Sequence, residues 1–422
     1  MNSTTLGSLE AEAEEAAARL RTTTAIRERA AQLLMRARDG ESSWFVVDEG
    51  ALDTAAREVA DATRRRYPKL RIPLHSRWRH FEAGGVDRRA QLEQLLAHLP
   101  ALARTHALID LTVVSVLLDA GAGPDWKYVD AASGQTSTRS EGLAAASYHA
   151  FVGGLFSSDP KHPAQADGNG LRALVGDHLA AAFQVTESNA IPGFQDRVIL
   201  LRRLGEVMLE EPEVFGAEAR PAGLFDLVAA PFGAAVSPTA AVNAHDILSQ
   251  LLYSLSPIWP NGNAIGQCPL GDCWRHAAVR GEGLSDGWMP LHKLSQWLTY
   301  SLIEPFAWGG VRVQHLDALT ALPEYRNGGL LLDTGVLRLR DEAAAGEIWH
   351  AGDEIIVEWR ALTVALMDEV AEGVRRELKM TPEQLPLACV LEGGSWAAGR
   401  ELAQRRRGGL PPLNVASDGT VF

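Results

Sequence analysis

The chain has 422 residues, a length that accommodates one large domain or two to three ordinary ones. Hydrophobic residues make up 46% of it and charged residues 22%, so the chain can bury a core and is not intrinsically disordered. The formal net charge of −13 opposes a general affinity for nucleic-acid backbone or anionic lipid.

No targeting segment is visible in the sequence. The first twenty residues lack the basic and apolar regions of a signal peptide. The apolar stretch 107–118 is shorter than the roughly 18 residues that a membrane span requires. Cys268, Cys273 and Cys389 have no metal-ligand spacing and are interpreted as buried or idle thiols in a reducing compartment. We therefore expect a cytoplasmic protein that has neither a membrane nor a nucleic acid as partner.

Helical periodicity dominates the chain. Residues 9–38, rich in Ala, Glu, Arg and Leu, predict one or two amphipathic helices. Further helices are predicted over 51–66, 88–104, 107–119, 140–156, 194–211, 243–254 and 290–304. The longest is predicted to begin after Gly352, with Asp353 as N-cap. Its buried face carries Ile356, Trp359, Thr363, Leu366, Val370 and Val374. A last helix is predicted over 383–407, with the arginines at 405–407 capping it or facing solvent.

Strand signals are few. Residues 336–340 alternate in polarity, and residues 43–47 are a candidate pairing partner. Segments 157–170, 256–290 and 408–422 are rich in Gly, Pro, Asp and Asn and predict loops. The predicted fold is all-α with few short strands. We divide it into an N-terminal helical segment (1–70), a main helical catalytic domain (71–407) and a flexible C-terminal tail (408–422).

Motifs of several enzyme classes are incomplete. Residues 330–335 resemble one loop of an aspartic protease, but that chemistry needs two such loops on β-rich lobes. Residues 392–397 lack the glycine placement of a nucleophile elbow. The sequence contains no Walker loop, dinucleotide fingerprint or HExxH motif. We therefore predict neither a cofactor nor a metal site.

Six short clusters combine charged side chains with aromatic rings or glycine turns. They lie at residues 76–81, 125–128, 139–142, 271–276, 292–297 and 324–329. Each alone is typical of a structural ion pair beside a packed ring. Together they indicate a polar pocket that suits a small phosphorylated or sugar-bearing ligand. The Gly-rich turn from Asp119 to Asp125 is either a plain helix C-cap or a ligand-facing loop.

Seven segments carry a resemblance to a known family. They read SRWRHFEAGGVDR, RSEGLAAASYHAFVGGLFSSDP, LLRRLGEVM, PIWP, LGDCWRH, PLHKLSQWLTYSLIEP and LTALPEYRNGGLLLDTGVLRLR. Together they closely resemble the fungal and bacterial uracil-catabolism protein 4 family, from about Arg71 to Arg407. The resemblance implies a step after the pyrimidine ring is opened, in which a ribosylurea or its phosphate loses urea.

The order of the motifs also resembles that of the queuosine-salvage nucleosidases. Those helical proteins are related in shape to DNA glycosylases and hydrolyse the bond between a base and ribose 5-phosphate. The second resemblance therefore implies a DNA-glycosylase-like helical bundle and an N-glycosyl hydrolase. The relatives have an aspartate where this chain has Glu324, and they lack the Gly328-Gly329 pair and the turn that begins at Asp333.

The chemistry of N-ribosyl cleavage suggests roles for these residues. The reaction passes through an oxocarbenium-like state, which requires a carboxylate near the anomeric carbon and a positioned water. Glu324 is the candidate to stabilise the cation or activate the water, and Asp333 is the candidate second carboxylate. Pro323 predicts that a new helix or tight turn begins directly after it, and the N-terminus of that helix is expected to keep the Glu324 carboxylate ionised. For substrate binding the candidates are Glu141 for the urea amides, Arg326, Lys293 and His292 for a phosphate, and Asp119, Lys127 and Arg79. A structural alternative for Arg326 is a salt bridge to Glu324.

Two other functions remain open from the sequence. An amidohydrolase acting on the ureido carbonyl would release ammonia and carbon dioxide, and it normally needs a metal or an activated nucleophile. A non-catalytic scaffold of the pathway would bind partner enzymes without turnover. We expect a metal-independent hydrolase of a small-molecule substrate. The sequence leaves open whether that substrate is phosphorylated and whether the chain forms a homo-oligomer.

Overall fold

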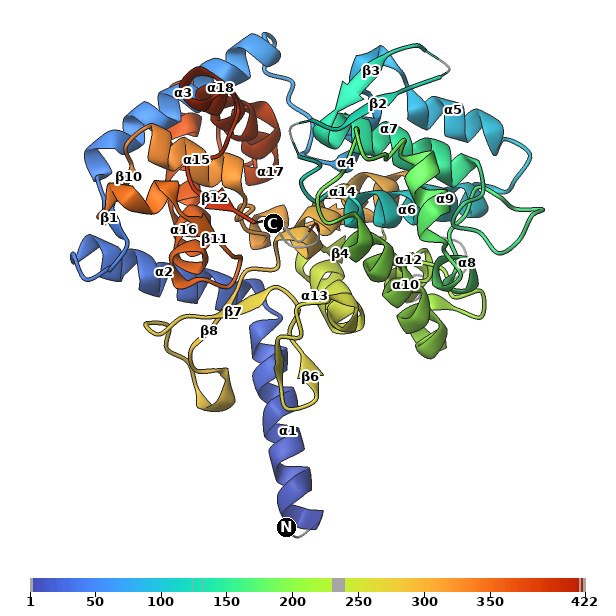
Figure 1. Ribbon diagram of the computed structural model, residues 1–422, viewed down its shortest axis with the longest axis horizontal. Coiled ribbons are helices and arrows are strands. Elements are labelled where there is room, and N and C mark those ends of the chain that lie inside the picture. Colours follow the sequence, from blue (N-terminus) through green and yellow to red (C-terminus); the bar gives the residue numbers. More distant parts are fainter. Residues whose placement is uncertain (1–2, 124, 132, 230–239, 417–418, 420–422) are drawn as a thin grey trace. The chain divides into compact units, whose positions relative to one another are not determined.

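The computed structural model describes residues 3–123, 125–131, 133–229, 240–416 and 419 (Figure 1). Helices hold 58% of the residues, and each strand has only two or three residues, so the predicted mostly helical fold is confirmed. The chain divides into two compact units. Unit 1 comprises residues 1–75, 263–296 and 316–416, and unit 2 comprises residues 76–262, 297–315 and 417–422.

This division differs from the three consecutive segments that we predicted. Residues 1–70 share unit 1 with residues 263–296 and 316–416, and the predicted main domain 71–407 contributes to both units. The chain passes between the units several times, so no single stretch of linker composition separates them. Within the predicted tail, residues 414–415 form a strand in unit 1.

Unit 1 is built mainly from helices of the two chain ends, drawn in blue and in orange to red in Figure 1. Its helices are α1 (Ser3–Leu20), α2 (Thr23–Arg38), α3 (Leu52–Arg66), α15 (Tyr325–Asp333), α16 (Glu354–Leu378), α17 (Leu387–Val390) and α18 (Trp396–Arg407). It also contains the first residues of α14 (Lys293–Trp308). Short 3-10 helices occupy Glu49–Ala51, Gly283–Ser285, Leu316–Ala318 and Glu342–Gly346.

The core of unit 1 forms around α16, which packs against α2 and α3. Residues at helical spacing on α2, such as Ile26, Ala30 and Leu33, meet Val357 and Ala361 of α16 in one buried cluster. All six residues of the predicted α16 face are buried. Asp353 occupies the predicted N-cap position, but its side chain accepts from His350 N–H and not from the first turn of the helix.

Strands in unit 1 pair two at a time. β1 (Phe45–Val47) pairs antiparallel with β10 (Leu337–Leu339), which confirms the predicted partners. The other pairs are β5 (Ala264–Ile265) with β6 (Cys268–Pro269), β7 (Cys273–Arg275) with β8 (Trp288–Pro290), and β11 (Ile348–Trp349) with β12 (Asn414–Val415). The prediction of a structureless loop over 256–290 was therefore wrong. A strand of two or three residues is too short to show the alternation of polar and apolar residues that predicts a strand. Between turns rich in Gly and Pro, such strands cannot be recognised from the sequence.

Unit 2 contains the helices that Figure 1 draws from light blue through green to yellow. They are α4 (Arg77–Phe81), α5 (Arg88–Leu95), α6 (Ala101–Leu117), α7 (Arg139–Val152), α8 (Gly168–Arg172), α9 (Gly176–Ala182), α10 (Phe194–Glu210), α11 (Pro212–Phe215), α12 (Gly223–Ala229) and α13 (Ala244–Leu255), with 3-10 helices at Ala83–Gly85 and Ser256–Ile258. Strand β2 (Lys127–Val129) pairs with β3 (Thr136–Thr138), and β4 (Ala241–Asn243) with β9 (Arg312–Gln314).

Helix α6 is buried on nearly all sides in its second half, from Ala107 to Leu117. Its apolar stretch therefore belongs to a protein core. None of the helices in the described ranges combines the length and hydropathy that crossing a bilayer requires. The predicted helix 88–104 is two helices, α5 and α6, because Pro100 ends the preceding segment and presets the chain for a new start.

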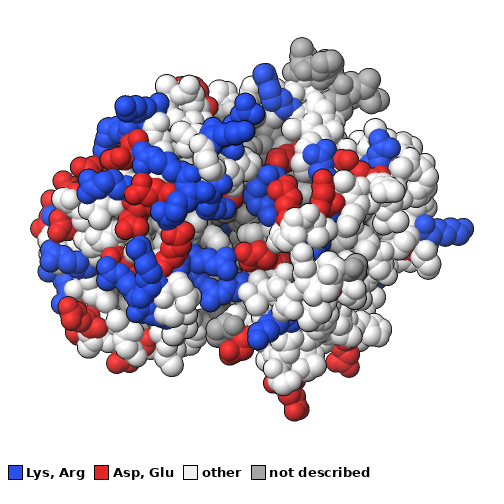
Figure 2. Space-filling model, turned by 90° about the horizontal axis from the view of Figure 1, so that it is seen from above, with Lys and Arg blue, Asp and Glu red and all other residues white. Residues whose placement is uncertain are grey.

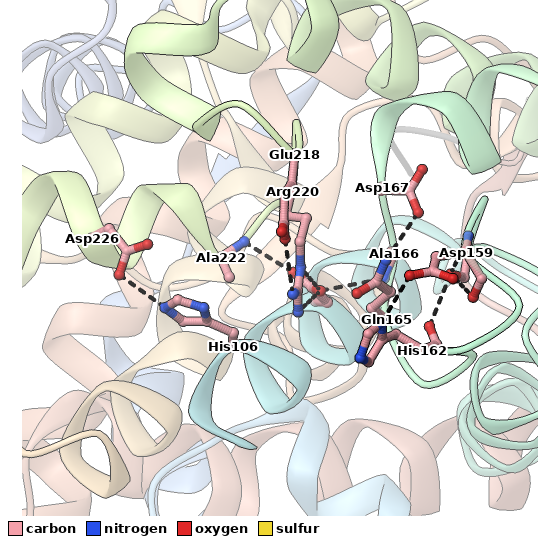
Figure 3. A network of polar contacts seen from close by, with 12 residues as sticks. His106, Asp159, His162, Gln165, Ala166, Asp167, Glu218, Arg220, Ala222 and Asp226 are labelled. Carbon is pink, nitrogen blue, oxygen red and sulfur yellow. Dashed lines mark hydrogen bonds and ion pairs between the residues drawn. The ribbon is translucent and has the colours of Figure 1, made fainter. Parts of the chain in front are cut away.

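A buried carboxylate of α6 holds two loops of unit 2 in place. Both Nε and Nη2 of Arg220 donate to Asp110 Oδ2, at 2.9 and 2.7 Å. The backbone N–H groups of Ala166 and Ala222 also donate to this carboxylate. Figure 3 shows Arg220, Ala166 and Ala222 converging, with Asp226 and His106 forming a separate pair to one side. Because the Asp110 carboxylate has four donors, we interpret the network as structural.

The C-terminal helical region departs from the predicted continuous helix 383–407. It begins at α17 after Pro386, passes through a π-helical turn at Leu391–Ser395 and continues as α18. Gly394 lies in this turn because an added Cβ would stand 2.1 Å from Val59 O of α3. The close approach to α3 brings Glu392 of the same turn against the end of α3.

We expect Glu392 to make the stability of the protein depend on pH. Its carboxylate accepts from Arg66 Nη2 and Tyr67 Oη, each at 2.9 Å, and lies 3.0 Å from His75 Nδ1. Burial alone would raise the pKa of Glu392, but His75, Arg66 and Tyr67 lower it from 4.5 to about 2. A depressed carboxyl pKa stabilises the fold above about pH 4.5, and this contribution is lost as pH falls towards 2.

Chemical denaturation of the wild type and Glu392→Gln at several pH values measures this contribution. At pH 7 the variant is expected to lose about 3 kcal/mol of unfolding free energy. The difference between the two proteins should shrink steadily below pH 4.5. A difference that is small at pH 7, or that stays constant down to pH 3, would show that the network does not favour the ionised carboxylate.

Basic and acidic side chains are interspersed on the face of the molecule that Figure 2 shows. In unit 1, exposed arginines of α3 and α18 pair with glutamates of the opposite helix, as in Arg65–Glu401 (2.6 Å) and Arg405–Glu58 (3.1 Å). Exposed pairs of this kind each contribute about 0–1 kcal/mol. Arg405 and Arg406 are exposed, as predicted, whereas Arg407 is half-buried in an ion pair described below.

Candidate functional site

A buried ion pair connects the start of α14 to α16 within unit 1. Arg360 donates from Nη1 and Nη2 to the two oxygens of Asp272, at 2.8 and 2.7 Å. Asp272 also accepts from Lys293 N–H (2.9 Å) and Trp274 Nε1 (2.7 Å). Burial alone would raise the pKa of Asp272, but Arg360 and these donors lower it. The carboxylate is therefore an ionised anchor that fixes the first residue of α14.

Glu324 lies at the start of α15, beside this anchor. Arg360 Nε donates to Pro323 O at 3.1 Å, which ties the preceding residue to the Asp272 pair. Glu324 is the N-cap of α15, and its two oxygens accept from Arg326 N–H and Asn327 N–H, both at 2.6 Å. The predicted helix start after Pro323 is confirmed.

The Glu324 carboxylate is buried, with 7% of the residue exposed. Burial raises its pKa, and the two N–H groups together with the charges of Lys293 and Arg326 oppose that rise. We expected the helix N-terminus to dominate and hold the group fully ionised. The pKa nevertheless lies above that of an ordinary glutamate, because the loss of hydration outweighs the favourable partners.

Two candidate phosphate ligands, Arg326 and Lys293, are buried near Glu324. Arg326 Nη1 donates to Gly409 O at 3.2 Å and the guanidinium lies over the Tyr325 ring, with Nε buried and without a hydrogen-bond partner among the described residues. The alternative of an Arg326–Glu324 salt bridge is not found among the ion pairs of the described residues.

His292 is less suited to bind an anion. Its Nε2 lies 2.9 Å from Leu20 O and 3.4 Å from Cys273 Sγ, and burial lowers the pKa of its imidazole. The ring is therefore neutral at neutral pH and already engaged. His292 has a φ of 45°, a strained conformation for a residue other than glycine, directly before the first residue of α14.

Asp333 lies at the opposite end of α15 from Glu324. The two residues are nine positions apart in the sequence, which corresponds to about 13 Å along the helix axis. Asp333 accepts from Arg407 Nη1 and Nη2 at 2.7 and 2.6 Å, so it fixes α18 against α15. Paired carboxylates that act on one glycosidic bond lie about 5–10 Å apart. The structure therefore does not bring the two predicted catalytic carboxylates together.

Unit 2 brings two of the predicted polar clusters, at 76–81 and 139–142, and the Gly-rich turn that begins at Asp119 together around Arg77. This buried guanidinium donates to Asp119 Oδ2 at 2.8 Å and to Ser140 O at 3.1 Å. Burial lowers the pKa of Arg77, and the negative charges of Asp119 and Glu141 oppose this shift. Asp119 and Glu141, both predicted to bind substrate, therefore belong to one polar cluster.

The two remaining candidates in unit 2 are surface residues or have other partners. Arg79 donates from Nη2 to both oxygens of Glu304, at 2.9 and 3.0 Å, and also pairs with Glu82. Lys127 is exposed in β2, where its backbone N–H donates to the Asn189 side chain.

Sequence reasoning missed Arg77, Asp272 and Arg360 as individual site residues. Arg360 lies in the stretch Ile355–Val364 of α16, in which every residue is buried, so a charged residue among these apolar ones was an available signal. Asp272 and Arg77 were inside predicted clusters, but the pairing of each depends on residues far away in the sequence. No group of three His, Cys, Asp or Glu side chains within the described ranges could hold a metal ion.

Comparison with known proteins identifies the family of the whole chain. Residues 19–422 match the profile of the family described as Protein of unknown function (DUF1688). The chain belongs to this family. It is 39% identical over 417 residues to the Schizosaccharomyces pombe protein named Protein urg3, an alignment that covers 97% of this chain and 99% of the relative. It is 36% identical over 413 residues to Uracil catabolism protein 4 of Lachancea kluyveri, covering 91% and 93% of the two chains. The predicted family membership is confirmed.

Proposed function

We propose that the chain acts in uracil catabolism and hydrolyses the N-glycosidic bond of a ribosylurea-type intermediate. The products would be urea and ribose, or ribose phosphate. Similarity over most of the chain to a protein named Uracil catabolism protein 4 supports the pathway. The observation that carries the reaction is the buried carboxylate of Glu324, which lies among the cations of unit 1.

Glu324 is suited to stabilise a developing positive charge. A carboxylate has about four lone-pair sites, and the two helix N–H groups occupy only one on each oxygen. Its burial strengthens any electrostatic interaction with an oxocarbenium-like sugar, because little water screens the charges. The backbone fixes the carboxylate before substrate binds, so no reorganisation is needed during the reaction.

Arg326 and Lys293 are proposed to bind the electronegative parts of the substrate. The buried Nε of Arg326 has no hydrogen-bond partner in the described part of the chain, and a guanidinium binds phosphate or carbonyl oxygens. The Asp272–Arg360 pair holds the start of α14 and the residue before Glu324 at fixed positions. We therefore assign positioning roles to Asp272 and Arg360. Asp333 is assigned to the packing of α15 against α18.

Hydrolysis in ¹⁸O-labelled water tests which bond breaks. Attack on the anomeric carbon would place the label on the released sugar and leave the urea unlabelled. The amidohydrolase alternative would place the label in carbon dioxide and release ammonia. Mass spectrometry of the products after a single turnover distinguishes the two reactions, and label in carbon dioxide would contradict the proposed one.

Turnover is expected to be independent of added metal. The described residues offer no group of three metal-ligating side chains, and the proposed chemistry relies on carboxylate and guanidinium groups. Activity should therefore remain unchanged after treatment with EDTA and gel filtration. Loss of turnover that zinc or magnesium restores would show that the reaction needs a Lewis acid.

A further inference from the structure

We infer that unit 2 contains a binding site for an uncharged ureide or amide, built on the Arg77–Asp119 ion pair. The residues come from three segments that are distant in sequence: the start of α4, the turn after α6 and the start of α7. None of them belongs to the Glu324 cluster of unit 1. The inference concerns equilibrium binding and does not depend on the proposed hydrolysis.

The ion pair leaves one hydrogen-bond donor and one acceptor unused. Arg77 Nη1 and Asp119 Oδ2 are 2.8 Å apart, and the two side chains have relative exposures of 0% and 5%. Arg77 Nη2 and Asp119 Oδ1 are buried and have no hydrogen-bond partner among the described residues. Nη2 shares its carbon with the paired Nη1, and Oδ1 shares its carbon with the paired Oδ2, so both unused atoms belong to the ion pair without bonding to each other. Leaving a buried donor and acceptor without partners is unfavourable, so a ligand that pairs with both atoms gains binding energy.

Neighbouring residues hold this pair rigidly. Arg77 Nε donates to Ser115 Oγ at 2.8 Å, and Ser115 Oγ is hydrogen-bonded to Ser147 Oγ at 2.6 Å. Behind the turn that carries Asp119, the buried Arg197 donates from Nη2 to the carbonyl oxygens of Ala120 and Gly121, both at 2.8 Å. Supporting hydrogen bonds of this kind are typical of pre-organised binding sites.

The unused atoms define the chemistry of the ligand. A donor beside an acceptor is complementary to a group in which an N–H adjoins a C=O, as in an amide or ureide. The N–H would donate to Asp119 Oδ1 and the C=O would accept from Arg77 Nη2. The charge of Glu141 also acts on Arg77, so two carboxylates face one guanidinium. This balance disfavours phosphate or carboxylate ligands and favours an uncharged group that carries N–H donors.

Solvent reaches the edge of the cluster. Glu141 and His80 are partly exposed, whereas the side chains of Arg77 and Asp119 are buried. An added Cβ at Gly121, in the adjacent turn, would meet no atom within 4 Å. The inference therefore places the entry of a small ligand on the side of the glycine-rich turn, and it assigns that turn a ligand-facing role in place of a plain helix C-cap.

Ligand-observed NMR with two small ureas tests the inference. N-methylurea carries N–H donors beside its carbonyl, whereas tetramethylurea carries the carbonyl alone, and neither contains a glycosidic bond. Saturation-transfer titrations of the full-length protein should give a dissociation constant for N-methylurea at least about 10-fold lower than for tetramethylurea. Binding of both ureas with equal affinity, or of neither, would overturn the inference.

Variants locate the binding within the protein. Asp119→Asn keeps the shape of the side chain but places an amide where the carboxylate oxygens were, and it should weaken N-methylurea binding roughly 10-fold. Asp130→Asn is the matched control, because Asp130 forms a similarly buried pair with Arg88 (2.7 Å) in the same unit. The control should bind N-methylurea like the wild type.

The outcomes separate the inference from the proposed function. If N-methylurea binds as expected but no ribosylurea is hydrolysed, the unit 2 site stands and the proposed function fails. If ribosylurea is hydrolysed but Asp119→Asn and Asp130→Asn bind N-methylurea alike, the inference fails. The comparison of the two ureas on the wild type does not require either variant to fold.

Discussion

Replacing Glu324 with Gln is expected to lower the turnover of a ribosylurea substrate roughly 100-fold or more. Glutamine preserves the size of the side chain, and its amide oxygen can still accept one N–H group of α15. It removes the negative charge that would stabilise an oxocarbenium-like sugar. The ground-state sugar carries no positive charge, so KM should change much less than kcat.

A matched variant separates the loss of charge from the loss of a helix cap. Asp341 also caps a helix, with its side chain accepting from Ala343 N–H at 2.9 Å, but it is exposed. Asp341→Asn should leave turnover unchanged. If Glu324→Gln stays folded and releases urea at a rate near that of the wild type, Glu324 is only a helix cap and the proposed catalytic role is wrong.

The pH dependence of turnover gives a second test of the same carboxylate. Because burial raises the pKa of Glu324, its protonation should reduce kcat at a higher pH than that of an ordinary glutamate. The acidic limb of the profile should therefore lie above pH 4.5 and disappear in Glu324→Gln. A limb that persists in the variant belongs to another group.

Replacing Asp110 with Ala is expected to destabilise unit 2 by about 3–5 kcal/mol. The change leaves Arg220, whose side chain is only 14% exposed, without the carboxylate it pairs with at 2.7 Å. The N–H groups of Ala166 and Ala222 also lose their acceptor (Figure 3). Urea denaturation followed by circular dichroism measures the loss.

Asp226 provides the control for this experiment. It pairs with His106 at 2.8 Å in the same region, but its side chain is 52% exposed. Asp226→Ala should cost less than about 1 kcal/mol, because water solvates both partners after the change. Equal effects of the two variants would show that the buried Asp110 network does not hold the loops of unit 2.

The sequence was sufficient to predict the elements that depend on local pattern. The face of α16 has apolar residues at spacings of three and four, and those residues are buried. Pro323 and Glu324 begin α15 as predicted, since both the proline restriction and the carboxylate cap are local effects. The pairing of β1 with β10 was predictable because the alternation at 336–340 was the clearest strand signal in the chain.

The ion pairs of the candidate site residues and the division into two units could not be predicted, because they depend on contacts between segments that are distant in the sequence. Asp333 looked like a second catalytic carboxylate until its pairing with Arg407, 74 residues away, was visible. Arg77 meets Asp119 and Ser140 only because α4, α6 and α7 pack together in unit 2. The two units alternate along the chain, so sequence order alone predicted a different division.

The most direct test of the proposed function is the product assay on purified protein. Ribosylurea and its 5-phosphate are incubated separately with the enzyme, and urea, reducing sugar and ammonia are quantified over time. The proposal predicts that one of the two compounds yields urea and reducing sugar in equal amounts, without ammonia. Ammonia without free urea would indicate cleavage of the ureido group, and no turnover of either compound would contradict the assignment of this chain as an N-glycosyl hydrolase.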